Sequence, residues 1–229
     1  MDELAGNLGY ILKLIAAAGA LGTAAFGLVD ASKALWGGVS RAGFGYVREA
    51  VEALLGPRVP GGTVFGHDQI LETLRANWMN GVAKAEQKAV AKSLIRLMLT
   101  PASAASMADA VGVNAVNLTA AATNIENNTP LTPQNMAALG AHDVKVSAML
   151  DFGYERGDQF YRNSAKIASA VCAILLSIAA KWIKDSTLGG SGLPMAILVG
   201  LIATPLAPIA KDLSTSLSTA VKAVGALKR

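Results

Sequence analysis

The stretch that decides the fold runs from residue 167 to residue 210 and reads IASAVCAILLSIAAKWIKDSTLGGSGLPMAILVGLIATPLAPIA. It contains two uncharged runs, at 167–180 and 186–210, and the apolar part of the second lies at 193–209. A helix needs about 20 mainly apolar residues to cross a bilayer. The first run approaches this length when the interfacial residues up to position 183 are included. The glycine-rich segment between the runs suits a tight connection, so we expect a transmembrane hairpin over 166–210.

A third apolar run, Leu14–Val29, lies near the amino terminus. If Lys13 extends toward the head groups, the segment starts at Leu8 and is about 33 Å long as a helix, which is enough to span a membrane. The leader Met1-Asp2-Glu3 is acidic, whereas a secretory signal begins with basic residues, so we expect a retained helix. One face of this helix is small enough for close helix packing and carries Ala18, Gly19, Gly22 and Ala25.

The composition agrees with a membrane protein. Of the 229 residues, 52% are apolar and 16% are charged, against about 25% charged residues in a typical soluble domain. The length allows one or two domains. The single cysteine, Cys172, excludes an intramolecular disulfide framework.

Positive charges near the predicted spans indicate their orientation. These cations follow the first span and precede the second: Lys33, Arg41, Arg48, Arg156, Arg162 and Lys166. Because cytoplasmic loops are enriched in Lys and Arg, we expect the amino terminus outside and the carboxyl terminus in the cytoplasm, in a bacterial-type inner or plasma membrane. The predicted parts are a first transmembrane helix at 1–33, a mainly helical cytoplasmic domain at 34–165, the hairpin at 166–210 and an amphipathic tail at 211–229.

The water-facing part of the chain reads as helical. We expect one helix that ends at Gly56-Pro57, and a second that runs from Asp68 toward Thr100-Pro101. A further helix is expected to begin at Thr132-Pro133, or to restart near His142, and to lead into the second span. The second helix carries a basic stripe at four-residue spacing, formed by Lys84, Lys88, Lys92 and Arg96. Such a stripe is either a solvated face or a contact for anionic lipid or an acidic partner.

Residues 107–113, MADAVGV, followed by AALG at 137–140, resemble the helix-turn-helix domains of the Cro and phage-repressor type. The resemblance covers about 45 residues and implies a recognition helix around 114–123. However, no Lys or Arg occurs between Pro101 and Val144, so this helix lacks the cations that contact phosphates and guanines. We therefore expect a small bundle for protein contacts, and nucleic acid is not an expected partner.

Sequence motifs for catalysis are missing. The chain has no nucleotide-binding loop, no Gly-x-Ser-x-Gly, no cysteine pair and no His-Glu-x-x-His, so we expect neither an enzyme nor a cofactor. The dipeptides His67-Asp68 and His142-Asp143 are better explained by capping and surface roles than by a metal site. Four residues are candidates for a pore or a helix break: Asp30, Thr204, Pro205 and Pro208.

These observations predict an all-α integral membrane protein with three transmembrane helices. The leading functional hypothesis is a homo-oligomeric scaffold or anchor whose cytoplasmic helices bind copies of the chain or partner proteins. The alternative is a homo-oligomeric channel whose third helix is broken by proline. Membrane-tethered nucleic-acid binding through the basic stripe ranks third.

Overall fold

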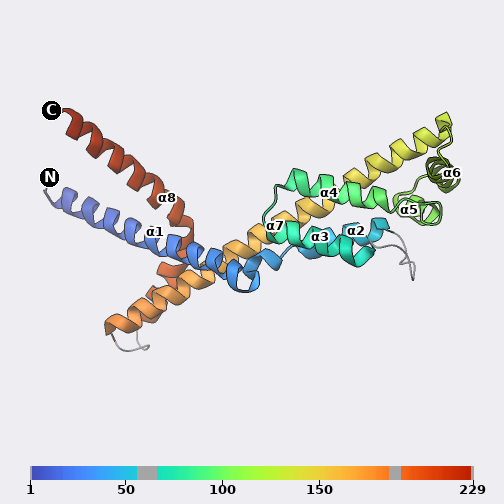
Figure 1. Cartoon of the computed structure of the whole chain (residues 1–229). Coiled ribbons are helices and arrows are strands. Elements are labelled where there is room, and N and C mark those ends of the chain that lie inside the picture. The colour runs from blue at the N-terminus through green and yellow to red at the C-terminus, as the bar shows by residue number, and fades with distance from the viewer. Residues whose placement is uncertain (1, 56–65, 186–191, 228–229) are drawn as a thin grey trace. The chain divides into compact units, whose positions relative to one another are not determined.

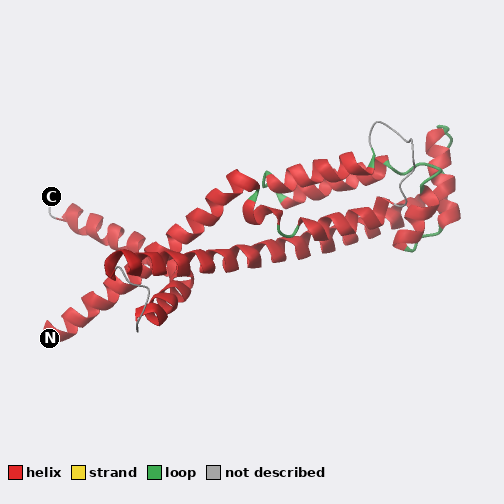
Figure 2. Ribbon diagram, turned by 90° about the horizontal axis from the view of Figure 1, so that it is seen from below, coloured by secondary structure: helices red, strands yellow, loops and turns green. Residues whose placement is uncertain are grey.

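The computed structural model describes the backbone of residues 2–55, 66–185 and 192–227, and the side chains of 13–32, 37–55, 66–184 and 192–209. All regular structure in these ranges is helical, as Figures 1 and 2 show. The elements are α1 (Asp2–Trp36), the short 3-10 helix η1 (Gly38–Arg41), α2 (Phe44–Leu55), α3 (His67–Met79), α4 (Lys84–Leu97), α5 (Ala104–Val111), α6 (Ala115–Glu126), α7 (Pro133–Asp185) and α8 (Gly192–Leu227). The prediction of an all-α chain is therefore confirmed for the described residues.

The chain divides into two compact units. We call Ser40–Tyr161 the helical domain, and Met1–Val39 together with Arg162–Arg229 the apolar unit. One helix, α7, contributes to both, because it continues for 53 residues. It begins at Pro133, where the backbone N–H of Asn135 donates to Thr132 Oγ1 at 3.2 Å. Of the two predicted starts for this helix, the structure has the first, with Thr132 as its cap.

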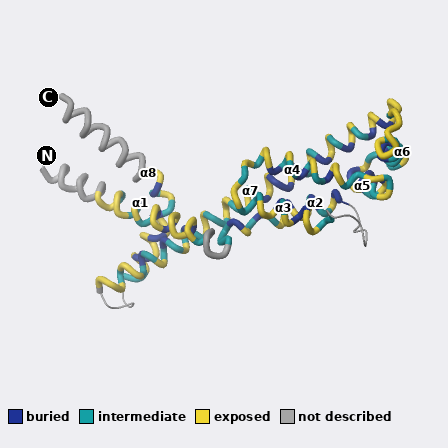
Figure 3. Tube along the Cα trace, in the orientation of Figure 1, coloured by how far each residue is buried: buried dark blue, intermediate teal, exposed yellow. Residues whose placement is uncertain are grey.

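The core of the helical domain lies where α2, α3, α4, α5 and α7 face one another. On α7 the buried side chains recur every four residues, at Val146, Leu150 and Tyr154, so that they line one face of the helix. Figure 3 colours the buried positions of these elements dark blue. The remaining core residues are Val47, Val51, Leu54 and Leu55 of α2, Ile70, Leu71 and Leu74 of α3, Ala91 and Ile95 of α4, and Met107 and Val111 of α5.

The single helix predicted from Asp68 toward Thr100 is wrong, because the chain forms two helices there. α3 ends at Met79, and Gly81 follows with φ +68°, a left-handed conformation that favours glycine. The backbone N–H of Asn80 donates to the carbonyl of Ala76 at 2.9 Å, which closes the last turn. The reversal allows buried residues of both α3 and α4 to join the same core, whereas one straight helix would carry its second half away from that core.

α5 and α6 form a helix, a short turn and a second helix, in the region that resembles the repressor domains. Gly112 ends α5 with φ 63° and ψ 48°, and Asn114 caps α6 by accepting a hydrogen bond from the Asn117 N–H at 2.9 Å. A separate small core, with Ala104, Ala108, Leu118 and Ala122 at its centre, holds the two helices together. Neither α5 nor α6 contains a Lys or Arg that could contact a phosphate.

Within the ranges that the structure describes, three helices are long and apolar enough to cross a membrane. The apolar segments are Lys13–Ser32 in α1, a window within Pro133–Lys184 in α7, and Gly192–Ile209 in α8. α8 is one continuous helix through Pro205 and Pro208 and extends to Leu227, so it includes most of the predicted tail. The two prolines that were predicted to break this helix therefore do not end it. Figure 1 shows instead that the axis of α8 changes direction along its length, as proline within a helix commonly causes.

Candidate functional sites: an ion-pair ladder and a helix junction

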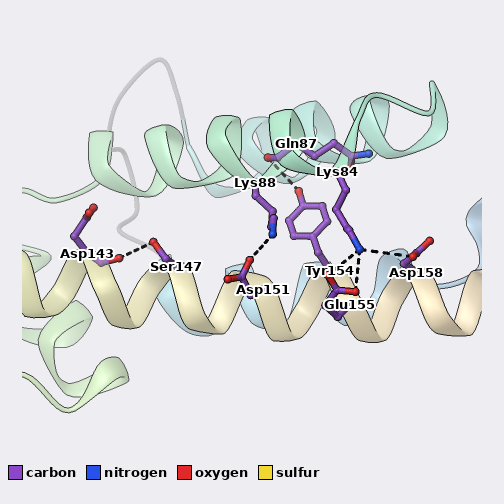
Figure 4. A network of polar contacts seen from close by, with 9 residues as sticks. All are labelled: Lys84, Gln87, Lys88, Asp143, Ser147, Asp151, Tyr154, Glu155 and Asp158. Carbon is purple, nitrogen blue, oxygen red and sulfur yellow. Dashed lines mark hydrogen bonds and ion pairs between the residues drawn. The ribbon is translucent and has the colours of Figure 1, made fainter.

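The basic stripe of α4 faces carboxylates of α7. Lys84 Nζ lies 2.7 Å from Glu155 Oε1 and 3.7 Å from Asp158 Oδ2. Lys88 Nζ is 2.5 Å from Asp151 Oδ1, and Lys92 Nζ is 2.7 Å from Asp143 Oδ2. Residue numbers rise along α4 while those of their partners fall along α7, so the two helices are antiparallel. We call these contacts, most of which are drawn in Figure 4, the ion-pair ladder.

The ladder is only half-buried, and this limits its strength. The lysine side chains are 29–37% exposed and those of their acidic partners are 26–62% exposed. Ion pairs in such surroundings contribute about 0–1 kcal/mol each and weaken with added salt. The ladder gives the basic stripe an intramolecular role, since any anionic lipid would have to compete with the α7 carboxylates for the lysines. Sequence reasoning missed this pairing, although the acids of α7 recur at helical spacing and are the complementary signal.

A buried polar layer lies beside the ladder. The hydroxyl of Tyr154 donates to the backbone carbonyl of Gln87 at 3.4 Å, and burial raises the pKa of the Tyr154 hydroxyl. Gln87 Nε2 donates to the carbonyl of Val82 at 2.5 Å, which holds the amide at the start of α4. The Tyr154 contact joins the side chain of α7 to the backbone of α4 beside the half-buried lysines, as Figure 4 shows for Tyr154 and Gln87.

His142 lies at the other end of the contact between α4 and α7. Its side chain is 6% exposed, and its Nε2 atom is buried with no hydrogen-bond partner among the described residues. Burial lowers the pKa of His142; the Asp143 carboxylate acts against this, and the Arg96 guanidinium reinforces it. Arg96, the last member of the basic stripe, and Lys92 line the same narrow recess as His142 and Asp143. Burial and the neighbouring Arg96 therefore favour the neutral form of the His142 imidazole.

In the apolar unit, small residues allow the helices to meet closely. Ala25 of α1, Ala173 of α7 and Ala203 of α8 are all 0% exposed and form one cluster. A Cβ atom on Gly22 would lie 2.7 Å from the carbonyl carbon of Ala203, closer than side chains can pack. Of the four residues predicted for helix packing, Gly22, Ala25 and Gly19 are buried and Ala18 is half-buried. We call this meeting point the helix junction.

α7 and α8 are also in direct contact. Ser177 Oγ of α7 donates to the carbonyl of Ala196 in α8 at 2.6 Å. A Cβ atom on Gly200 would lie 2.5 Å from the Cα of Ile174, so only glycine permits this approach. The two helices therefore pack through small side chains over at least two turns, as expected for a pair in which hydrophobicity gives no drive for association.

The candidate pore residues occupy different surroundings. Asp30 is exposed near the end of the apolar segment of α1, and the side chain of its predicted partner Lys33 lies outside the described residues. Pro205 and Pro208 are exposed within α8, whereas the Thr204 hydroxyl is buried with no partner among the described residues. Of the four residues, Thr204 alone has a buried polar atom without a described partner.

Two of the open grooves on the described part of the helical domain are bordered by α7. One, of about 380 Å³, lies between α2 and α7, and there the Arg156 guanidinium stacks 4.6 Å from the centre of the Tyr46 ring. The other, of about 400 Å³, lies between the α5–α6 turn and α7 and is lined by amides and Lys145, whose Nζ donates to the Gly112 carbonyl at 2.6 Å. Among the described residues no three His, Cys, Asp or Glu side chains gather as metal ligands.

Comparison with other proteins adds no relative. The chain matches no protein-family model, no curated protein and no solved structure.

Proposed function

We propose that the chain is an integral membrane scaffold, anchored by the apolar unit, whose helical domain lies in the cytoplasm and binds further copies of the chain. The observation that carries the proposal is the distribution of side chains in the apolar unit. Apart from Val29, its buried residues with described side chains are small or carry hydroxyls, and include Ala25, Ser169, Ala173, Ser177 and Ala203. Its exposed residues include Leu14, Phe26, Leu28, Ile167, Val171, Leu175, Met195, Leu198, Leu201 and Ile202. Water-soluble units bury large apolar side chains, so this inverted arrangement favours lipid as the solvent.

Membrane insertion is tested by flotation of the full chain with liposomes, followed by washing at alkaline pH. We expect the protein to float with the lipid and to resist the wash, because three apolar helices are inserted. Release by the wash would show a peripheral protein and would refute the anchor. Accessibility of the helical domain to protease in oriented vesicles then tests the proposed topology, with the amino terminus outside and the carboxyl terminus in the cytoplasm.

Self-association is proposed for the charge-poor end of the helical domain. Between Leu97 and His142 the only charged residues are Asp109 and Glu126, so two copies meet there with little like-charge repulsion. Large apolar side chains are exposed in and beside this stretch: Leu97, Val116, Ile125, Met136 and Val144. Exposed apolar surface outside a membrane commonly marks a protein contact.

The test is the mass of the full chain, measured by native mass spectrometry in mild detergent. We expect an oligomer that dissociates in Val116→Asp, because Val116 is 77% exposed and a charge there would be desolvated in the contact. Ser93→Asp places the same charge on an exposed position of α4 and is expected to leave the mass unchanged. A monomeric wild-type chain, or equal behaviour of the two variants, would refute this surface.

A homo-oligomeric pore is the second candidate, and the buried hydroxyl of Thr204 beside two prolines in α8 favours it. Ion flux through reconstituted vesicles is the test. Flux that is lost in Pro205→Ala or Asp30→Ala would select the pore, whereas vesicles that stay as tight as protein-free ones would leave the scaffold.

A further inference from the structure

The contacts between α7 and α8 define an antiparallel register. Ser177 pairs with Ala196, and one turn further along α8 Gly200 packs against Ile174 and the carbonyl of Ala173. Each step of about four residues forward along α8 therefore corresponds to about four residues back along α7. The next step in this register brings Thr204 of α8 level with Ser169 of α7.

Both residues at this level carry a buried hydroxyl without a partner. Ser169 is 0% exposed, and neither its Oγ atom nor the Oγ1 atom of Thr204 has a hydrogen-bond partner among the described residues. The hydroxyls of Ser177 and Thr23, by contrast, donate to backbone carbonyls at 2.6 and 2.9 Å. A buried hydroxyl without a hydrogen-bond partner lowers the free energy of unfolding by about 1–3 kcal/mol. Two such hydroxyls at the same level along the helices therefore indicate a bound molecule that forms hydrogen bonds with both.

The carbonyls freed by the prolines do not belong to this level. Proline has no backbone N–H, so Pro205 cannot donate to the carbonyl of Leu201, and Pro208 cannot donate to the carbonyl of Thr204, but both prolines lie on the exposed side of α8. The two buried hydroxyls by themselves supply the minimum of two polar partners that a buried water requires. A cation fits less well, because no Asp or Glu occurs between Asp158 and Asp185 or at 192–209 to offset its charge.

We propose that the hydroxyls of Ser169 and Thr204 form a hydrated polar site that binds water between α7 and α8. The site rests on the proposed membrane insertion of the apolar unit. Ser169 lies only two residues after Ile167, where the uncharged run of α7 begins, so the site lies near the end of the span that adjoins the helical domain. Water reaches it from that face of the membrane.

The test is the reactivity of introduced cysteines toward a cationic, membrane-impermeant methanethiosulfonate, added to the full chain in vesicles. The cysteine thiolate attacks the sulfenyl sulfur of the reagent, forms a mixed disulfide and expels methanesulfinate, and this thiolate forms in water and not in hydrocarbon. The background is Cys172→Ala, which removes the native thiol. Ser169→Cys is compared with Val171→Cys, which is 50% exposed on the same helix, and Thr204→Cys with Ile202→Cys, which is 42% exposed on α8.

We expect the two site cysteines to react at least about tenfold faster than their lipid-facing controls, since thiolate forms only at the hydrated positions. Ser93→Cys on the exposed surface of α4 provides the rate in open water. Site cysteines that react as slowly as their controls, in variants that elute like the parent in detergent, overturn the hydrated site and leave membrane insertion standing. Controls that react at the Ser93→Cys rate overturn the membrane location itself, and the hydrated site with it.

Discussion

Gly22→Ala should separate the helices of the apolar unit at the helix junction. A Cβ atom at this position would lie 2.7 Å from the carbonyl carbon of Ala203 and 3.0 Å from the Cβ of Ala207. Carbon atoms pack at about 3.5–4.0 Å, so α1 would have to move away from α8 by about 1 Å. A gap of that size removes roughly a quarter to a half of the dispersion attraction of each affected atom pair, and overpacking of this kind costs about 1–3 kcal/mol.

The matched control is Gly27→Ala on the same helix, where an added Cβ meets nothing within 4 Å. Both substitutions gain the same helix propensity, about 0.5–1 kcal/mol, so the difference between them isolates the steric effect. The free energy of unfolding, measured by SDS titration of the full chain in mild detergent, should be about 1–3 kcal/mol lower for Gly22→Ala than for Gly27→Ala. Values that agree within about 0.5 kcal/mol would refute the close approach of α1 to α8.

Three further predictions concern the helical domain, each read from the unfolding of the full chain in detergent. Burial lowers the pKa of His142 in the folded state, so as the pH falls below about 6.5 the unfolded chain takes up a proton first and stability declines; His142→Gln should remove this part of the slope, and a slope that stays unchanged in the variant would exclude His142 as the cause. A double-mutant cycle of Lys88→Ala and Asp151→Ala should give a coupling of about 0.2–1 kcal/mol that shrinks in 1 M salt; a coupling that does not respond to salt would contradict an exposed ion pair. Leu150→Ala should lower the free energy of unfolding by about 2–5 kcal/mol, because this side chain is 1% exposed; a loss under about 1 kcal/mol would indicate a loosely packed core.

The helix predicted from Asp68 toward Thr100 shows where sequence reasoning failed. Gly81 follows Asn80, and an Asn-Gly pair commonly marks a turn, but the prediction of one helix passed over this pair. The core also requires the buried faces of both α3 and α4. Local sequence and the packing of the domain therefore agree on the reversal at this position.

The basic stripe was visible in the sequence, but its role was not. Lys84, Lys88 and Lys92 recur at four-residue spacing, and this spacing holds whether they meet water, lipid or protein. Their carboxylate partners lie about 50–70 residues later on α7, and only the antiparallel packing of α4 against α7 brings the two rows together.

The hydropathy of the sequence alone predicts the all-helical class and the three apolar helices of the described residues. Each apolar run is a continuous stretch of sequence, and the hydrogen bonds of a helix join residues close together in the chain, so both features can be recognised locally. The contacts of the small residues at the helix junction and the level pairing of Ser169 with Thr204 depend instead on which helices touch. Contacts between residues far apart in the chain follow from packing as a whole, and no local pattern specifies them.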